Sequence, residues 1–166
     1  MVDKIIVHNN RCGMEETEKE TKKSVFSNTA QAISKRILVA DDNKVIRNAV
    51  AWFLEFMGFE VALPANGIEA LAVFLESTFD LVITDLQMPA MDGLSLASHI
   101  KERSPSTPVI LLTGCDRETV WKKVESAPVA SVIFKPFRLK DLQRIVQGAL
   151  ASKEREHGSV GGGVTS

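Results

Sequence analysis

The sequence predicts an α/β protein whose doubly wound, five-stranded parallel sheet carries helices on both faces. Between Arg36 and Ser152, five short apolar runs alternate strictly with five segments of helical periodicity. This order requires parallel strands joined by crossover helices. Four of the five apolar runs end on polar residues, which a parallel sheet brings to one edge. Hydrophobic residues make up 45% of the chain, enough to build a core.

The first half of the patterned region predicts two strands and two helices before the central strand. We expect a strand at 37–40, a helix at 44–57, a strand at 59–63 and a helix at 68–77. The residues that recur at helical spacing in the first helix are Val45, Ala49, Trp52, Phe53 and Phe56. We expect Gly58 to end that helix and Asn66 to cap the start of the next one.

The central strand is expected at 79–85, where an apolar run ends on Asp85. A turn with Pro89 and Gly93 follows, and a helix is expected at 94–103, ended by Ser104-Pro105. The elements expected after it are a strand at 108–113, a less amphipathic helix at 114–126, a strand at 129–134 and a helix at 139–152.

The two ends of the chain lack a core pattern, so we expect the domain at 36–152. Residues 1–35 are expected to form a flexible arm, because residues 15–23 are highly charged and contain no apolar side chain. Residues 153–166 hold four of the ten glycines and are expected to be a disordered tail. His8 and Cys12 have the spacing of two helical metal ligands, but with no other ligand pair nearby they are better interpreted as solvated arm residues.

Composition excludes several classes of protein. The net charge of −1 gives no argument for nucleic acid or membrane as a partner. No apolar run is long enough to span a bilayer, and the N-terminus lacks the apolar stretch of a secretory signal. Two cysteines are too few for a disulfide framework. We therefore expect a soluble, cytoplasmic protein that binds neither nucleic acid nor membrane.

The polar residues at the strand ends suggest phosphoryl chemistry; they are Asp41, Asp42, Asp85, Thr113 and Lys135. Three carboxylates at one edge repel each other and raise one another's pKa unless a cation lies among them. Hard oxygen ligands suit Mg²⁺ or Mn²⁺. A lysine and a hydroxyl complete a set that fits phosphoryl transfer, in which a carboxylate can itself be the nucleophile. The other interpretation has the first two aspartates capping a helix and the lysine in a single surface ion pair.

This arrangement resembles the receiver domain of two-component response regulators, over roughly Arg36 to Ser152. An acidic pair, Asp41-Asp42, follows the first strand, and Asp85 begins a D-x-x-M-P-x-M-D-G stretch that is matched without a gap. Thr113 ends the fourth strand, and Lys135-Pro136-Phe137 ends the fifth. The resemblance implies a flavodoxin-like strand order of 2-1-3-4-5 and a cis peptide bond before Pro136.

The resemblance also implies a function, that of a single-domain phosphoacceptor and not a conventional enzyme. A histidine kinase or a histidine phosphotransfer protein would donate the phosphoryl group to Asp85. Asp42, Asp85 and the backbone carbonyl of Gln87 would bind Mg²⁺, with Asp41 acting mainly through water. Lys135 would bind the phosphoryl group. At most, such a domain catalyses its own phosphorylation and dephosphorylation.

Two positions depart from the family pattern and bear on the output. In the family the residue at Thr113 swings toward the phosphoryl group, and Tyr or Phe usually lies three residues before the lysine, where this chain has Val132. Gly114 stands where Ala is commoner, so we expect the shift to be coupled to the loop that follows it. The 114–152 face is expected to bind a downstream protein, and a homodimer is an open alternative.

Two other functions stay open from the sequence. One is a receiver-like scaffold that binds partners without phosphorylation, which the intact Asp85, Thr113 and Lys135 argue against. The other is a Mg²⁺-dependent phosphatase with an aspartate nucleophile, of the haloacid-dehalogenase type. Such enzymes carry D-x-D at the first strand, where this chain has adjacent aspartates, and 166 residues leave little room for a substrate cap.

Overall fold

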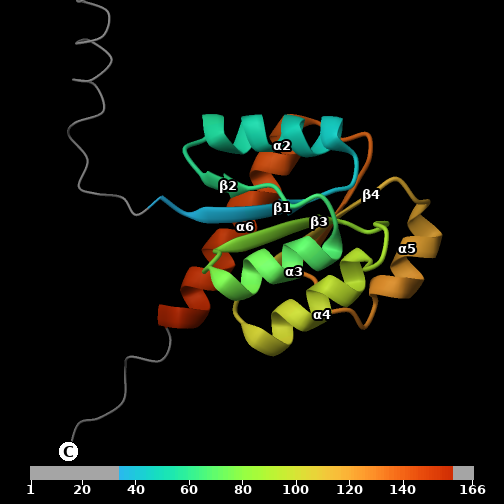
Figure 1. The fold of residues 1–166 in the computed structure, drawn as a ribbon. Coiled ribbons are helices and arrows are strands. Elements are labelled where there is room, and N and C mark those ends of the chain that lie inside the picture. The colour runs from blue at the N-terminus through green and yellow to red at the C-terminus, as the bar shows by residue number, and fades with distance from the viewer. Residues whose placement is uncertain (1–33, 159–166) are drawn as a thin grey trace, which may run out of the picture. The chain divides into compact units, whose positions relative to one another are not determined.

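The computed structural model describes residues 34–158, which form a five-stranded parallel sheet with helices on both faces (Figure 1). The strands are β1 (Arg36–Ala40), β2 (Glu60–Ala62), β3 (Leu81–Asp85), β4 (Val109–Thr113) and β5 (Ser131–Phe134). The helices are α2 (Lys44–Phe56), α3 (Gly67–Glu76), α4 (Gly93–Arg103), α5 (Arg117–Val124) and α6 (Leu139–Gly158). The expectations for residues 1–33, including His8 and Cys12, and for 159–166 lie outside the described residues.

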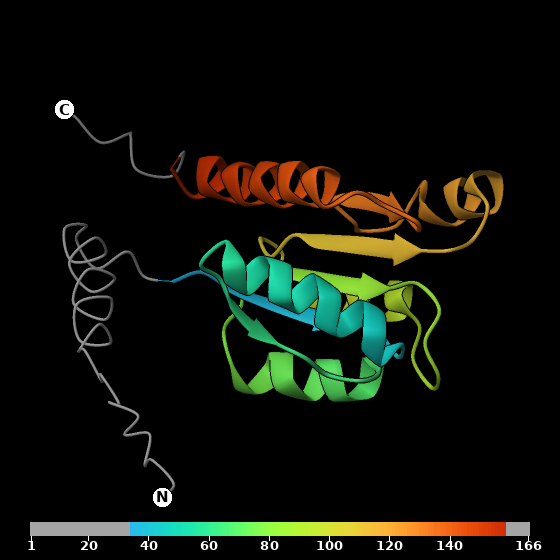
Figure 2. The same ribbon diagram turned by 90° about the horizontal axis from the view of Figure 1, so that it is seen from above.

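The sheet has the expected strand order, β2-β1-β3-β4-β5, with every pairing parallel. In Figure 2 the strand arrows point toward the same side, so the carboxyl ends of the strands share one edge. β3 and β4 are buried along their whole lengths, as expected for central strands covered by helices on both faces. None of the helices in residues 34–158 is both long and apolar enough to cross a membrane.

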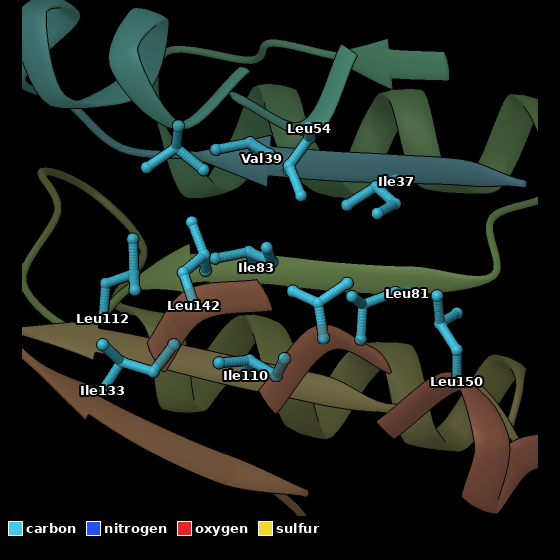
Figure 3. Close-up of a cluster of buried hydrophobic side chains, with 12 residues drawn as sticks. Ile37, Val39, Leu54, Leu81, Ile83, Ile110, Leu112, Ile133, Leu142 and Leu150 are labelled. Atoms are coloured by element: carbon cyan, nitrogen blue, oxygen red, sulfur yellow. The ribbon is translucent and has the colours of Figure 1, made fainter. Parts of the chain in front are cut away.

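The core is divided by the sheet into two layers. On one face α2 and α6 cover alternate residues of the strands, as Figure 3 shows for Leu54 beside Val39 and for Leu142 beside Ile83. On the other face α3 and α4 pack on Leu38 and Val82, and α5 extends this layer over Leu111. Because successive strand residues point to opposite faces, both layers draw on the same strands.

Asparagine and aspartate side chains set the starts of four helices. Asn43 caps α2, so the alternative in which Asp41 or Asp42 caps this helix is wrong. Asn66 caps α3 as expected, since its side chain accepts a hydrogen bond from the Glu69 N–H at 2.9 Å. Asp92 caps α4 and Asp116 caps α5, which is why α5 begins at Arg117 and not at residue 114 as predicted.

The last helix is longer than predicted, so residues 153–158 belong to α6 and not to a disordered tail. Lys153 is 19% exposed, and its ammonium lies 3.3 Å from Asp80 Oδ1 at the start of β3. Lys35, which was assigned to the arm, pairs with Glu154. Ion pairs therefore hold the charged end of α6 to the sheet. The composition of this segment did not predict them.

Helix α2 has a second apolar face that points away from the core. Val50 and Leu54 are buried, whereas Val45, Trp52 and Phe56 are 77%, 65% and 77% exposed. The helical spacing was interpreted correctly as a helix, yet four of the five residues that carry the pattern are exposed, and only Phe53 among them packs on the core. The helix is apolar on both sides, and periodicity alone does not say which side faces inward.

Candidate functional site

Four strands bring polar residues to one edge of the sheet. Asp41 follows β1 directly, Asp85 is the last residue of β3, Thr113 is the last residue of β4, and Lys135 follows β5. The parallel register keeps these ends level, because the pairing of β3 with β4 includes Asp85 and that of β4 with β5 includes Thr113. The convergence expected from the strand order is therefore present in the fold.

Lys135 bridges the two buried carboxylates of this edge. Its Nζ lies 2.8 Å from Oδ2 of Asp41 and 3.2 Å from Oδ1 of Asp85. The Asp41 side chain is fully buried, and the Lys135 side chain is 17% exposed. With little water nearby, the ammonium supplies the positive charge that the two carboxylates need. The other interpretation, in which this lysine makes a single surface ion pair, is therefore wrong. The Lys135–Pro136 peptide bond is cis, as the resemblance implied.

Three carboxylates gather beside this lysine. Asp41, Asp42 and Asp85 each offer an oxygen, and these oxygens lie within 4.8 Å of one another. Asp42 is exposed, whereas the other two are buried. Asp42 and Gln87 also line one hollow of about 600 Å³, together with Pro89 and Lys123. An all-oxygen set that opens to solvent on one side suits a hard divalent cation that keeps part of its water shell.

Burial raises the pKa of Asp85 above its ordinary value of 3.8. The charge of Lys135 and its hydrogen bond lower this pKa, the charge of Asp41 raises it, and a 2.9 Å hydrogen bond from the Leu86 N–H lowers it. The net direction is upward, because the cost of burying the charged carboxylate outweighs the stabilisation that Lys135 and the Leu86 N–H provide. A cation beside the carboxylates would favour their charged form and so lower this pKa.

Thr113 is 1% exposed, and its hydroxyl oxygen accepts a hydrogen bond from the Cys115 N–H at 3.1 Å. Because the Thr113 oxygen accepts this hydrogen bond from the loop after β4, its hydroxyl proton points elsewhere and can be donated to another group. Gly114 lies between the two partners, and a Cβ at this position would meet nothing within 4 Å. No steric contact in this state therefore requires a glycine there.

The loop from β3 to α4 is held tightly against Asp85. The Gly93 N–H donates to the Leu86 carbonyl at 3.0 Å, which brings the start of α4 against the strand end. A Cβ on Gly93 would collide with the Asp85 carbonyl. Ala90, at the tip, has a φ of 65°, which is uncommon for a residue with a side chain. Gly93 was read from the sequence only as a turn residue, and its role is close packing beneath the acidic edge.

Sequence reasoning missed two groups that lie close to these residues. Arg47 on α2 donates a hydrogen bond through Nη1 to the Asp41 carbonyl and so holds the chain after β1. On β5 the residue before the lysine, Phe134, lies edge to face with Trp121 at 6.2 Å, and the Arg117 guanidinium sits 4.7 Å from its ring centre. Val132 packs in the same cluster. An aromatic residue is thus present on β5, two positions after the one that the family pattern emphasises.

Comparison with known proteins agrees with this geometry. The response regulator receiver domain family matches residues 37–147, two thirds of the chain. The chain belongs to the response regulator receiver domain family. This family is a signalling domain that works through histidine kinases and downstream targets, and it is not a conventional enzyme.

Two curated relatives are response regulators of greater length. Regulator of RpoS from Escherichia coli K12 is 33% identical over 117 residues, which cover 70% of this chain and 34% of the relative. Response regulator MprA from Mycobacterium sp. strain KMS is 30% identical over 125 residues, covering 74% of this chain and 54% of the relative. The chain therefore spans a third to about half of the length of these relatives.

Solved structures show the same fold at similar identity. The CheY-like receiver domain protein of Methanospirillum hungatei JF-1 is 30% identical with a TM-score of 0.70, covering 74% of this chain and 98% of that one. The response regulator TrrA of Thermotoga maritima, solved in complex with Mg²⁺-BeF, is 32% identical with a TM-score of 0.64, covering 69% and 98%.

Proposed function

We propose that the chain is a phosphoacceptor switch that takes a phosphoryl group onto Asp85 from a histidine kinase or a histidine phosphotransfer protein. The contact of Asp85 with Lys135, at the end of the central strand, carries this proposal. Asp41 is fully buried, and Asp42 is exposed but is not in the Lys135 bridge. Asp85 alone combines a position on the central strand with partial access, since its side chain is 12% exposed.

The transfer is a displacement at phosphorus. An Asp85 carboxylate oxygen attacks the phosphorus of the donor phosphohistidine, the P–N bond breaks, and the imidazole nitrogen takes back the bonding electron pair. Lys135 neutralises charge on the transferred oxygens, and the Leu86 N–H holds the Asp85 carboxylate in place. Thr113 would donate its hydroxyl proton to the new acyl phosphate.

A divalent cation fits the carboxylate group. Its donors would be the carboxylates of Asp42 and Asp85 and the Gln87 carbonyl, with Asp41 acting mainly through water. The cluster of carboxylate oxygens, which lie within 4.8 Å of one another, supports this assignment. The Mg²⁺-BeF complex of the Thermotoga relative supports Mg²⁺ as the ion. When bound, the ion would offset negative charge on the phosphoryl oxygens during transfer.

Intact-mass measurement after treatment with acetyl phosphate and Mg²⁺ tests the proposal. We expect one phosphoryl group on the natural chain, released by hydroxylamine as an acyl phosphate is, and none on Asp85→Asn. Asp92→Asn is the matched control, because Asp92 caps α4 in the following loop and lies outside the Lys135 bridge. Equal labelling of Asp85→Asn and the natural chain would rule out Asp85 as the acceptor.

The same measurement decides the scaffold alternative, which requires no phosphoryl uptake from any donor. The phosphatase alternative loses its basis because the family is a signalling domain.

For the output, we propose that a downstream protein binds the 114–152 face. Trp121 is 54% exposed there, and it lines a groove of about 340 Å³ with Phe134 and Arg138. The domain limits at 36–152, extended to the end of α6, and the cytoplasmic location stay predictions.

A further inference from the structure

The outward face of α2 carries an apolar seam with heptad spacing. Its members are Val45, Ala49, Trp52 and Phe56, spaced by four, three and four residues, and all four are exposed. The rings of Trp52 and Phe56 stack on each other with centroids 6.0 Å apart. Alternating steps of four and three residues form the continuous stripe by which one helix packs along another. Figures 1 and 2 both show this side of α2 uncovered by any other described element.

We propose that this seam is a dimer interface in which α2 packs antiparallel against α2 of a second copy of the chain. A twofold axis that passes between Val50 and Ala51 places Val45 opposite Phe56 of the second copy and Ala49 opposite its Trp52. Each large ring then meets a smaller side chain, which allows the helices to approach closely. In a parallel pair the same rings would meet each other and hold the helices apart.

Charge supports the same orientation. Lys44 at the start of α2 and Glu55 near its end are both exposed, and helical spacing puts them on the same flank of the seam. An antiparallel pair brings Lys44 of each copy toward Glu55 of the other, whereas a parallel twofold pair puts these flanks on opposite sides and makes no such ion pair. The two helix dipoles also oppose each other only in the antiparallel arrangement. The interface is isologous, as a closed twofold dimer requires.

The size of the seam predicts a weak dimer. α2 has 13 residues and so is about 20 Å long, and one helix face of that length buries less than the roughly 800 Å² per partner of a standard interface. We therefore expect a weak equilibrium in which the monomer predominates at low micromolar concentration. The proposal does not depend on phosphoryl transfer and is tested on the unphosphorylated chain.

Sedimentation equilibrium of the full chain, from low micromolar to millimolar concentration, tests the proposal. We expect a monomer–dimer equilibrium whose dissociation constant rises at least about tenfold in the Trp52→Gln/Phe56→Gln double variant. Leu75→Gln is the control, because Leu75 on α3 is 54% exposed but lies outside the seam. A natural chain that stays monomeric throughout, or a dimer that both ring substitutions leave unchanged, would overturn the proposal.

A charge exchange tests the orientation separately from hydrophobicity. Lys44→Glu and Glu55→Lys are each expected to weaken the dimer, because each puts two like-charged pairs across the interface. The Lys44→Glu/Glu55→Lys double variant restores opposite charges and is expected to return to the natural dissociation constant. Circular dichroism of each variant checks that α2 still forms. If the double variant weakens the dimer by as much as the two single variants together, the antiparallel pairing is excluded.

Discussion

Asp85 carries a carboxyl group whose pKa is raised by burial in the folded chain, from an ordinary value of 3.8. The folded state therefore holds the proton more tightly than the unfolded chain does. As pH rises from 3.8 through the raised pKa, ionisation of Asp85 removes stability, and above that interval the loss is complete. Asparagine has nearly the same shape and no charge.

We therefore predict that Asp85→Asn is more stable than the natural chain at neutral pH, with a melting temperature a few degrees higher in the presence of a chelator. The difference should shrink as pH is lowered toward 3.8, because both chains then carry a neutral side chain at this position. Thermal unfolding of both proteins across that pH range measures it. A difference that is constant with pH would show that packing, and not charge, separates the two.

Lys135→Ala is predicted to destabilise the fold when no divalent cation is present. The substitution leaves Asp41, which is fully buried, and Asp85 without their common positive partner. Breaking a buried pair in this way costs about 2 to 4 kcal/mol of unfolding free energy. Millimolar Mg²⁺ should restore part of the loss. Urea unfolding with and without Mg²⁺ measures both effects, with the exposed Lys122→Ala on α5 as control.

At the scale of single elements, α4 depends on a residue without a side chain. Gly93→Ala is predicted to lower the unfolding free energy by about 2 kcal/mol or more, since the new Cβ would collide with the Asp85 carbonyl and push α4 away. Gly148→Ala is the matched control. It lies inside α6 with open space around its Cβ, so alanine there should raise stability by about 1 kcal/mol. Equal effects in urea unfolding would argue against the close approach at Gly93.

The sequence predicted the carboxyl ends of β1, β3, β4 and β5 correctly, because each is an apolar run that a polar residue or a turn ends. It did not predict which side of α2 faces the core, because Val50 and Leu54 on one side and Val45 and Trp52 on the other are all apolar. The start of α5 was misplaced because a cap depends on where one carboxylate, that of Asp116, reaches a backbone N–H.

The fold as a whole was predictable because strict alternation of strands and helices leaves few topologies. The acidic residues followed from their positions at strand ends. The bridge from Lys135 to both Asp41 and Asp85 did not, because a strand end fixes where a backbone lies and not which oxygen a long side chain reaches. The helical extension past Ser152 was also missed, because it is held by Lys153 pairing with Asp80, far away in the sequence.

Truncation tests the limits of the domain. A chain of residues 34–158 is predicted to unfold at the same temperature as the full chain and to accept a phosphoryl group equally well. A chain ending at Ser152 loses the contacts of Lys153 with Asp80 and with the Phe79 carbonyl, which lies 3.3 Å from its ammonium. We expect it to lose about 1 kcal/mol of unfolding free energy. Identical melting temperatures for the two truncated chains would show that the end of α6 does not stabilise the domain.

The chain has no tyrosine and only two tryptophans, Trp52 and Trp121. They lie on α2 and α5, which pack on opposite faces of the sheet, and each is more than half exposed. Trp52 is therefore exposed on the α2 seam and Trp121 on the 114–152 face, the two surfaces for which a partner is proposed. Replacing either one by phenylalanine leaves a single tryptophan, so burial of the α2 seam and burial of the 114–152 face can be followed separately in two single-tryptophan variants.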